Sequence, residues 1–227
     1  MCGRFSLATD IYMLQEQFNF EFNDEVTINP RFNVAPSQQI LTIGSNGGKR
    51  IGITMKWGLV PSWSKDSKIG YKMINARAEG IDQKPSFKTP FKRKRCLIVC
   101  DGFYEWKKEG TNKQPFRFVM EDGRPFAFAG LWDKWDKWDK NGEPLYSCTI
   151  ITTTPNKITQ EVHNRMPVIL EEDAYDLWMD SEMNDTEYLK SLLIPFPSKK
   201  MKSYPVSTIV NSPKNDVAEC LSPVNSL

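Results

Sequence analysis

Apolar and polar residues alternate along much of the chain, and this period of two is typical of β-strands. Gln39 to Ile43 and Ile51 to Trp57 are predicted strands around the turn Ser45-Asn46-Gly47-Gly48. Phe116 to Met120 and Phe126 to Leu131 are predicted to form a second hairpin, with an Asp-Gly turn between them. The pattern therefore predicts antiparallel strand pairs that are joined by short turns.

Other segments predict strands that belong to the same core. Cys96 to Cys100 is a continuous apolar run, which is the signature of a strand buried on both faces. Tyr146 to Thr154 is a further β-rich segment, and the tail adds one more predicted strand near Tyr204.

Helical spacing is confined to short segments. Thr9 or Asp10 is suited to cap a helix whose apolar side holds Ile11, Leu14 and Phe18. The remaining predicted helices cover Asn156 to Val162, Glu171 to Met179 and Thr186 to Leu193.

The segment Ile74-Asn75-Ala76-Arg77-Ala78-Glu79 predicts a loop that enters a helix, with Asn75 as its cap. Arg77 would then lie in the first helical turn, where the helix dipole favours acidic residues. A residue that breaks a local rule is a reasonable candidate for function.

Many strands against four short helices predict an α+β domain with antiparallel sheets. A length of 227 residues suits one large domain or two small ones. Because no low-complexity linker divides the chain, we expect a single domain over residues 1–227, with a loosely ordered tail after about residue 212.

Composition narrows the class of protein. Apolar residues make up 40% of the chain, yet no apolar run reaches 18 residues, so we expect a globular protein without a membrane span. The start of the chain has no secretory pattern. Five irregularly spaced cysteines do not form a disulfide framework, and Cys96 and Cys100 lack the neighbours of a zinc site. We therefore expect a reducing cytoplasm, and no metal.

Charge is unevenly distributed although the net charge is only +2. Residues 49–95 contain 13 Lys and Arg and 3 acidic residues, a local +10, so the remainder sums to −8. This asymmetry indicates a surface that faces a polyanion such as a nucleic acid. The alternative is that the basic residues, including the cluster Lys92-Arg93-Lys94-Arg95, only form a solvated face.

The chemistry of the chain's start depends on Cys2. If Met1 is removed, as is expected when residue 2 is small, Cys2 carries a free α-amine beside its thiol. The amine has a reference pKa of ~8, and the thiol's pKa of ~8.5 falls beside a cation such as Arg4. Such an aminothiol condenses with an aldehyde to a thiazolidine ring. The alternative is that Cys2 is only a small hydrophobe.

Three further positions have both a functional and a structural interpretation. Glu105 lies between Tyr104 and Trp106, so it is either desolvated with a raised pKa or simply faces water. His163, the single histidine, is suited to proton transfer but is also a common structural residue. Trp63 stands in a polar, basic loop and either stacks on bases or folds over the core.

The stretch Asp133 to Lys140 repeats Asp-Lys-Trp almost three times. Its period is too short for a solenoid repeat, so we interpret it as an exposed extension of a hairpin.

Six motifs together resemble the SRAP family, the SOS-response-associated peptidases with their HMCES-like members. They follow the family's order and cover nearly the whole chain: Met-Cys-Gly-Arg-Phe at 1–5, Arg-Phe-Asn-Val-Ala-Pro at 31–36, Trp-Gly-Leu-Val-Pro-Ser-Trp at 57–63, Ile-Asn-Ala-Arg-Ala-Glu at 74–79, Gly-Phe-Tyr-Glu-Trp at 102–106 and His-Asn-Arg-Met-Pro-Val at 163–168.

The resemblance implies a fold of twisted antiparallel sheets that form a pseudo-barrel. It implies capture of abasic sites in single-stranded DNA through a covalent bond to Cys2, without a metal or an organic cofactor. The implied catalytic residues are Cys2, Asn75, Glu105 and His163. The implied DNA-binding residues are Arg4, Pro36, Trp63, Arg77, Trp106 and Arg165. The implied protein is a monomer that acts at the nucleoid, with weak lyase activity as a side reaction.

Two other functions stay open at this point. Cys2 and His163 are also the residue types of a cysteine peptidase, which would release Met1 by autocatalysis. The basic stretch 49–95 alone would suit a non-covalent binder of single-stranded nucleic acid.

Overall fold

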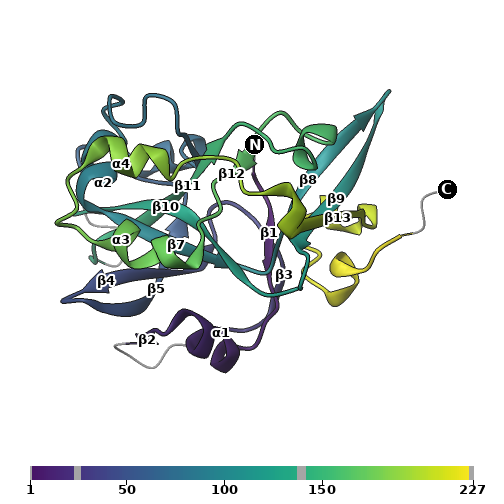
Figure 1. Ribbon diagram of the computed structural model, residues 1–227, viewed down its shortest axis with the longest axis horizontal. Coiled ribbons are helices and arrows are strands. Elements are labelled where there is room, and N and C mark those ends of the chain that lie inside the picture. Colours follow the sequence, from purple (N-terminus) through teal and green to yellow (C-terminus); the bar gives the residue numbers. More distant parts are fainter. Residues whose placement is uncertain (1, 23–26, 137–141, 225–227) are drawn as a thin grey trace.

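The computed structural model describes residues 2–22, 27–136 and 142–224 (Figure 1). Its centre is a closed five-stranded barrel. The order β5–β4–β7–β10–β11 is antiparallel throughout, and a parallel pairing of β11 with β5 closes the ring. These strands are β4 (Gln39–Asn46), β5 (Lys49–Trp57), β7 (Arg95–Cys100), β10 (Phe126–Trp135) and β11 (Leu145–Thr153).

A second sheet of five antiparallel strands packs beside the barrel, in the order β13-β9-β8-β1-β3. Its N-terminal strand β1 lies between β8 and β3, in the middle of the molecule (Figure 1). The strands are β1 (Phe5–Leu7), β3 (Arg31–Val34), β8 (Gly102–Glu109), β9 (Asn112–Met120) and β13 (Met201–Pro205).

Short elements complete the chain. The strands β2 (Glu21–Phe22), β6 (Asn75–Arg77) and β12 (Met166–Pro167) extend the barrel sheet. The α-helices are α1 (Ile11–Phe18), α2 (Lys88–Arg93), α3 (Tyr175–Met179) and α4 (Thr186–Ser191). Helices α2, α3 and α4 gather on one side of the molecule, whereas the β8–β9 hairpin projects on the other (Figure 1). Single 3₁₀ turns cover Ser67–Lys72, Thr159–Glu161, Glu172–Ala174, Ser198–Lys200, Thr208–Asn211 and Ala218–Leu221.

Alternate residues of the barrel strands enter two different cores, as the pleat of a strand requires. On β7, Leu97 and Val99 face a core that the helices cover. Cys96 and Ile98 face a second core, which the aromatic residues of the other sheet fill, among them Phe103. A strand that is buried on both faces explains why 96–100 is apolar without a gap.

The expected fold class is confirmed. The structure is α+β, with twisted, mainly antiparallel sheets that form a pseudo-barrel and a few short helices. The strands β4, β5, β9 and β10 lie where the pattern placed them, and β4 and β5 pair as the expected hairpin. The second predicted hairpin is wrong, because β9 pairs with β8 and β13 in one sheet whereas β10 pairs with β7 and β11 in the barrel. Asp10 caps α1 by accepting a hydrogen bond from the Tyr12 backbone N–H.

The helix expected to begin at Asn75 is wrong. Residues Asn75–Arg77 form strand β6, which pairs in parallel with Ile150 to Thr152 of β11. Ala76 is fully buried between its neighbours. Because the backbone of β6 bonds to β11, Arg77 is an exposed residue at the end of a strand and its position does not oppose a helix dipole.

The stretch from Asp133 does extend a hairpin, that of β10 and β11, and Asp136 is exposed, but the expectation that the whole extension is exposed is wrong. Asp133 and Trp135 belong to β10 and are 3% and 8% exposed. Asp133 accepts hydrogen bonds from the Ser62 backbone N–H and from Lys94 Nζ, and Trp135 Nε1 donates to the Ser64 carbonyl. The β10 end thus fastens the loop that carries Trp63. Residues 137–140 lie outside the described part of the chain.

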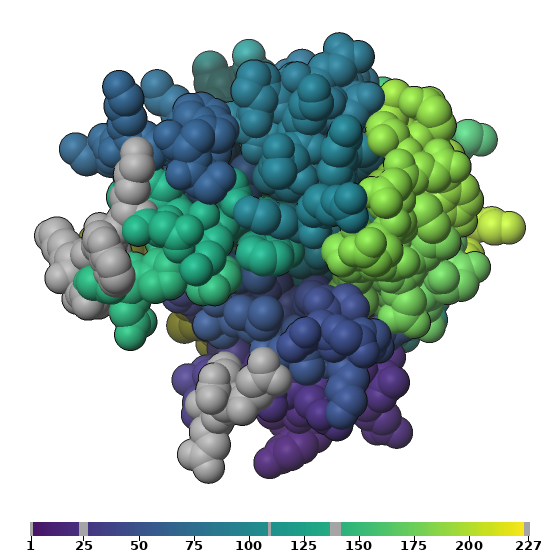
Figure 2. Space-filling view, turned by 90° about the vertical axis from the view of Figure 1, so that its left-hand side faces the viewer, coloured from purple at the N-terminus to yellow at the C-terminus, as the bar shows by residue number. Residues whose placement is uncertain are grey.

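The basic cluster at 92–95 is not uniformly solvated. Arg95 is only 2% exposed, and its guanidinium donates to backbone carbonyls at the ends of α2 and α3, including those of Phe91 and Trp178. These carbonyls are the unpaired acceptors of helix ends, so Arg95 holds both helices against β7. Figure 2 shows the blue-to-teal chain that carries the basic stretch 49–95 spread over one face, next to the green α3–α4 segment.

A buried carboxylate fastens β1 to the rest of the structure. Asp101 accepts hydrogen bonds from Ser6 Oγ and from the backbone N–H groups of Ala8 and Thr9, at 2.6, 2.5 and 3.0 Å. Arg117 matches its charge at 3.0 Å. Because every group on the carboxylate belongs to β1, its continuation or Arg117, this site determines where the first residues lie.

The segment after residue 212 contacts the same sheet. The Asp216 carboxylate bonds to the Arg31 side chain and accepts from the Phe32 and Asn33 backbone N–H groups. Cys220 is fully buried.

We predict that Asp101→Asn lowers the free energy of unfolding by about 3 kcal/mol, because it leaves the buried Arg117 without a counter-charge. Urea unfolding monitored by tryptophan fluorescence measures this. Glu172→Gln is the control, since it removes the same charge from an exposed pair with Arg124. Equal unfolding midpoints for the two variants would contradict the anchoring role.

Candidate active site and DNA-binding cavity

An open polar cavity lies where the first residues meet the β8–β9 hairpin. Its walls come from elements far apart in the sequence. They are Arg4 ahead of β1, Glu105 and Trp106 on β8, Lys113 on β9, His163 ahead of β12, and Asn211. Four of these were expected site residues, so the structure brings together Arg4, Glu105, Trp106 and His163.

Cys2 is 0% exposed and does not line the cavity, but it neighbours two residues of its wall: its Sγ lies 3.9 Å from the Arg4 carbonyl oxygen, and the charge of Glu105 acts on it. Its side chain packs in the core that includes Phe5, Val34 and Trp57. Burial raises the pKa of the Cys2 thiol well above its ordinary value, and the negative charge of nearby Glu105 adds to the rise. The expectation that Arg4 lowers this pKa is therefore wrong, because the Arg4 guanidinium points elsewhere.

Arg4 is oriented by three groups. Its Nη1 donates to Asn33 Oδ1 at 2.8 Å and to the Val210 carbonyl at 2.7 Å, and its guanidinium lies 5.7 Å from the centre of the Trp106 ring. Trp106 Nε1 in turn donates to Asn211 Oδ1 at 2.7 Å. The result is a cation stacked on an indole at the cavity wall, a pairing that suits a phosphate beside a base or sugar.

Glu105 is desolvated, which confirms the first of its two interpretations. It is 4% exposed, although its strand β8 leads to an exposed hairpin tip. Burial raises the pKa of Glu105 to about 7. A carboxyl group with such a pKa exchanges protons readily near neutral pH, as a general acid or base must.

His163 is held by the backbone of Arg165. Its Nδ1 lies 3.1 Å from the Arg165 amide nitrogen and 3.2 Å from the Arg165 carbonyl oxygen. Either tautomer can use one of these groups, so Nε2 is the ring nitrogen that would exchange a proton with a ligand in the cavity. Partial burial lowers the pKa of His163, which favours the neutral ring.

Asn75 has an acceptor that the described residues leave unused. Its Nδ2 donates to the Ile74 carbonyl at 3.0 Å, whereas its Oδ1 is buried and has no hydrogen-bond partner within the part of the chain that the structure describes. Buried acceptors without a partner are uncommon and indicate a ligand or a functional contact.

The remaining expected cations differ in their state. Arg77 is exposed on β6. Arg165 is largely buried and bonds to Glu79 through both terminal nitrogens, Nη1 to Oε1 at 2.6 Å and Nη2 to Oε2 at 2.9 Å. Its charge is therefore already matched by a carboxylate.

Trp63 and Pro36 do not line the cavity. Trp63 is 56% exposed, so it does not fold over the core. Pro36 precedes Ser37, whose φ of 74° makes a tight turn against the Trp57 carbonyl. Trp63 is thus an exposed position and Pro36 a partly buried one, and both lie outside the cavity wall.

Sequence reasoning missed two residues of the cavity wall, Lys113 and Asn211. Lys113 pairs with Lys108 across the β8–β9 hairpin, so the turn at Gly110 and Thr111 just before it was the available signal. Asn211 carried no signal, because only the fold brings it to Trp106.

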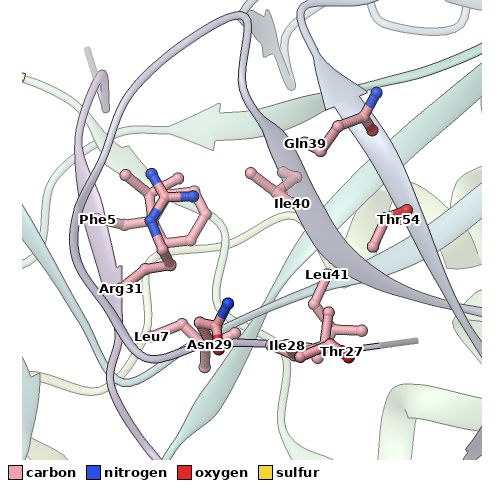
Figure 3. A pocket seen from close by; sticks show the side chains of 11 residues that line it. Phe5, Leu7, Thr27, Ile28, Asn29, Arg31, Gln39, Ile40, Leu41 and Thr54 are labelled. Atoms are coloured by element: carbon pink, nitrogen blue, oxygen red, sulfur yellow. The ribbon is translucent and has the colours of Figure 1, made fainter. Parts of the chain in front are cut away.

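A separate pocket opens on β1 (Figure 3). Side chains converge there from β1, from residues 27–31 and from the β4–β5 hairpin, and most are apolar. None of the four catalytic candidates lines it. Its cation Arg31 is bonded to Asp216 and to Gln38.

The described residues do not meet the requirements of a metal site, a disulfide or a membrane-spanning helix. Among the described residues no group of three or more His, Cys, Asp or Glu side chains is placed to hold a metal ion. All five cysteines are buried and none is in a disulfide. No helix within the described ranges has the length and apolarity that crossing a membrane requires.

The chain is similar to several known proteins along nearly its whole length. It is 49% identical to the abasic site processing protein YoqW of Bacillus subtilis over 97% of this chain and 99% of that protein. It is 35% identical to the abasic site processing protein HMCES of Gallus gallus, over 99% of this chain and 78% of that one. A crystal structure of a Bacteroides thetaiotaomicron protein superposes with a TM-score of 0.88 at 28% identity, covering 99% of this chain and 100% of that one.

The sequence model of one family, described as SOS response associated peptidase (SRAP), matches residues 1–213. Together with these relatives, the match shows that the chain belongs to the SRAP family.

Proposed function

We propose that this protein captures abasic sites in single-stranded DNA by forming a thiazolidine between Cys2 and the aldehyde of the opened sugar. The observation that carries the proposal is the nearness of Cys2 to two residues of the cavity wall: its Sγ lies 3.9 Å from the Arg4 carbonyl oxygen, and it is within reach of the charge of Glu105, whose pKa is about 7. The same wall includes an imidazole and the arginine that stacks on Trp106. Relatives with 49% and 35% identity are named abasic site processing proteins, which supports the same substrate.

The reaction begins with hydrolysis of the Met1–Cys2 bond, which frees the α-amine of Cys2. The amine attacks C1′ of the ring-opened deoxyribose, and loss of one water gives an imine. The Cys2 sulfur then adds to C1′, and the thiol proton moves to the imine nitrogen. The adduct therefore equals the processed protein plus DNA minus one water.

Burial of the thiol is compatible with this order of events. A thiol with a raised pKa stays protonated and does not react with passing oxidants or electrophiles. Its proton is the one that the ring closure transfers to nitrogen. The amine, whose reference pKa is ~8, is the group that attacks first.

Glu105 and His163 have distinct roles in the proposal. Glu105 lies close enough for its charge to act on the thiol, so it is placed to protonate the leaving hydroxyl during imine formation. His163 is placed to donate from Nε2 to the sugar oxygen as the furanose opens. Asn75 Oδ1, a buried acceptor, would receive a hydrogen bond from the freed α-amine.

DNA would lie over the cavity with its phosphates near Arg4, Arg77 and Arg165. Trp63 and Trp106 offer exposed or half-exposed indole surface for neighbouring bases. An abasic nucleotide has no base to unstack, so its sugar enters the cavity at little cost.

We predict that purified protein and single-stranded DNA with one abasic site form a heat-stable adduct, and that Cys2→Ala abolishes it. Intact-mass spectrometry is expected to show protein without Met1 plus DNA minus one water. As a matched control, one glycine inserted between Met1 and Cys2 keeps the thiol but removes the α-amine from it, and should also abolish the adduct.

A full yield of stable adduct from Cys2→Ala would refute the mechanism. Equal, salt-sensitive binding of intact and abasic DNA without any adduct would favour the non-covalent binder. Retention of Met1 in His163→Ala would favour autocatalytic peptidase activity over removal by a host aminopeptidase.

We predict that the rate of adduct formation is nearly level between pH 7 and ~8, where loss of the Glu105 proton offsets deprotonation of the α-amine, and falls about tenfold per pH unit above ~8, because Glu105 with a pKa of about 7 loses the proton it must donate. Below pH 7 the rate falls as the α-amine becomes protonated. Single-turnover assays from pH 5.5 to 9 measure the profile. In Glu105→Gln the alkaline fall should vanish, and the slower rate should rise to a plateau above ~8. An unchanged alkaline limb in that variant would exclude Glu105 as the acid.

A further inference from the structure

The Glu79 carboxylate binds Arg165, one of the arginines that the proposed function assigns to the DNA phosphates. Both carboxylate oxygens of Glu79 bond to the Arg165 guanidinium, at 2.6 and 2.9 Å. The Glu79 side chain is 57% exposed and that of Arg165 only 12%. The bidentate geometry is the one an arginine also uses for a phosphate, so Glu79 occupies the position that a DNA phosphate would take.

Arg165 is tied to the site on its other side. Its Nη2 donates to the Thr152 carbonyl of β11 at 2.6 Å, and its backbone contacts Nδ1 of His163. Glu79, two residues after β6, thus joins β6, β11 and the 163–165 turn through a single guanidinium. Displacing that guanidinium would loosen the turn that orients His163.

We infer that Glu79 is a positioning residue that acts through Arg165, keeping His163 in place for catalysis at the expense of phosphate affinity. This inference rests on the proposed function and adds to it a residue that neither contacts the aldehyde nor attracts DNA. An acidic side chain on a DNA-facing arginine weakens binding, so a catalytic benefit explains its presence.

The inference requires two effects of opposite sign from one substitution. Removing the carboxylate charge leaves Arg165 for a phosphate, which strengthens binding. The same change removes the clamp on the 163–165 turn, which slows the chemistry. Damage to the fold would instead weaken DNA binding and also slow the chemistry. Tighter binding together with a slower rate therefore distinguishes a positioning role from a structural one.

The experiment compares Glu79→Gln with Glu172→Gln as its matched control. Glu172 bonds to Arg124 at 2.9 Å and is exposed, so its variant changes the net charge equally at another arginine pair. Binding is measured by fluorescence anisotropy with single-stranded DNA that contains a tetrahydrofuran abasic analogue. That analogue has no aldehyde, so it forms no adduct with Cys2. Binding can therefore be measured on protein that keeps its natural Cys2. Chemistry is measured as the single-turnover rate at saturating DNA with a natural abasic site.

We predict that Glu79→Gln lowers the dissociation constant for the tetrahydrofuran DNA two- to fivefold, about the range of an exposed ion pair. The salt dependence of binding should steepen by about 0.7, the value for one added phosphate contact on a single strand. The single-turnover rate should fall about tenfold, as is common when an orienting partner is lost. Glu79→Asp, which keeps the charge, should restore the dissociation constant to the native value.

Weaker binding by Glu79→Gln, or changes equal to those of Glu172→Gln, would overturn the inference. An unchanged rate together with tighter binding would also overturn it, because no positioning would remain. Absence of any adduct with the natural protein would instead refute the proposed function, and the binding arm would still report on Glu79.

Discussion

The structure depends on how firmly the first strand is held. β1 has only three residues, yet it lies between β8 and β3. The Asp101 carboxylate also accepts hydrogen bonds from Ser6 of β1 and from the backbone N–H groups of Ala8 and Thr9 that follow it. The Tyr104 backbone N–H also bonds to the Arg4 carbonyl. A chain end normally moves freely. Here the end is fixed from Arg4 to Thr9, so Cys2 has a defined position beside Glu105. A terminal aminothiol can act on a substrate only where the rest of the protein holds it.

Burial then adjusts the chemistry of each group. The same low-polarity surroundings raise the pKa of the Cys2 thiol and the Glu105 carboxyl and lower that of His163. All three shifts favour neutral side chains. The site is therefore suited to moving protons between neutral partners, which imine formation requires, and it does not rely on a thiolate. This places the proposed mechanism apart from that of a cysteine peptidase, whose thiol is activated by a lowered pKa.

Two arginines at the site, Arg4 and Arg165, are held in place by groups of the protein itself. Arg4 lies against Trp106 and bonds to Asn33, and Arg165 bonds to Glu79 and the Thr152 carbonyl. Fixed arginines lose little side-chain freedom on binding a phosphate. The two differ in charge balance, because Arg4 meets neutral acceptors whereas Arg165 meets a carboxylate. One groove can thus contain both an attracting cation and a restrained one.

The sequence alone determined the strand-rich α+β class, the β4–β5 hairpin and the α1 cap, because period and turn chemistry are local properties. It supplied Cys2, Glu105 and His163 as candidate residues through their type and motifs. It wrongly predicted a hairpin of β9 with β10, which pair in different sheets. It misjudged Asn75 to Arg77 as a helix start, since parallel pairing with β11 is a contact between segments far apart in the chain. Only the tertiary structure decided that the side chains of Glu105 and Arg95 are buried. It also decided that the Arg4 guanidinium does not act on the Cys2 thiol and that Glu79 pairs with Arg165. Each of these depends on which distant groups share a volume, and exposure and electrostatic pairing are set by that packing and not by neighbours in sequence.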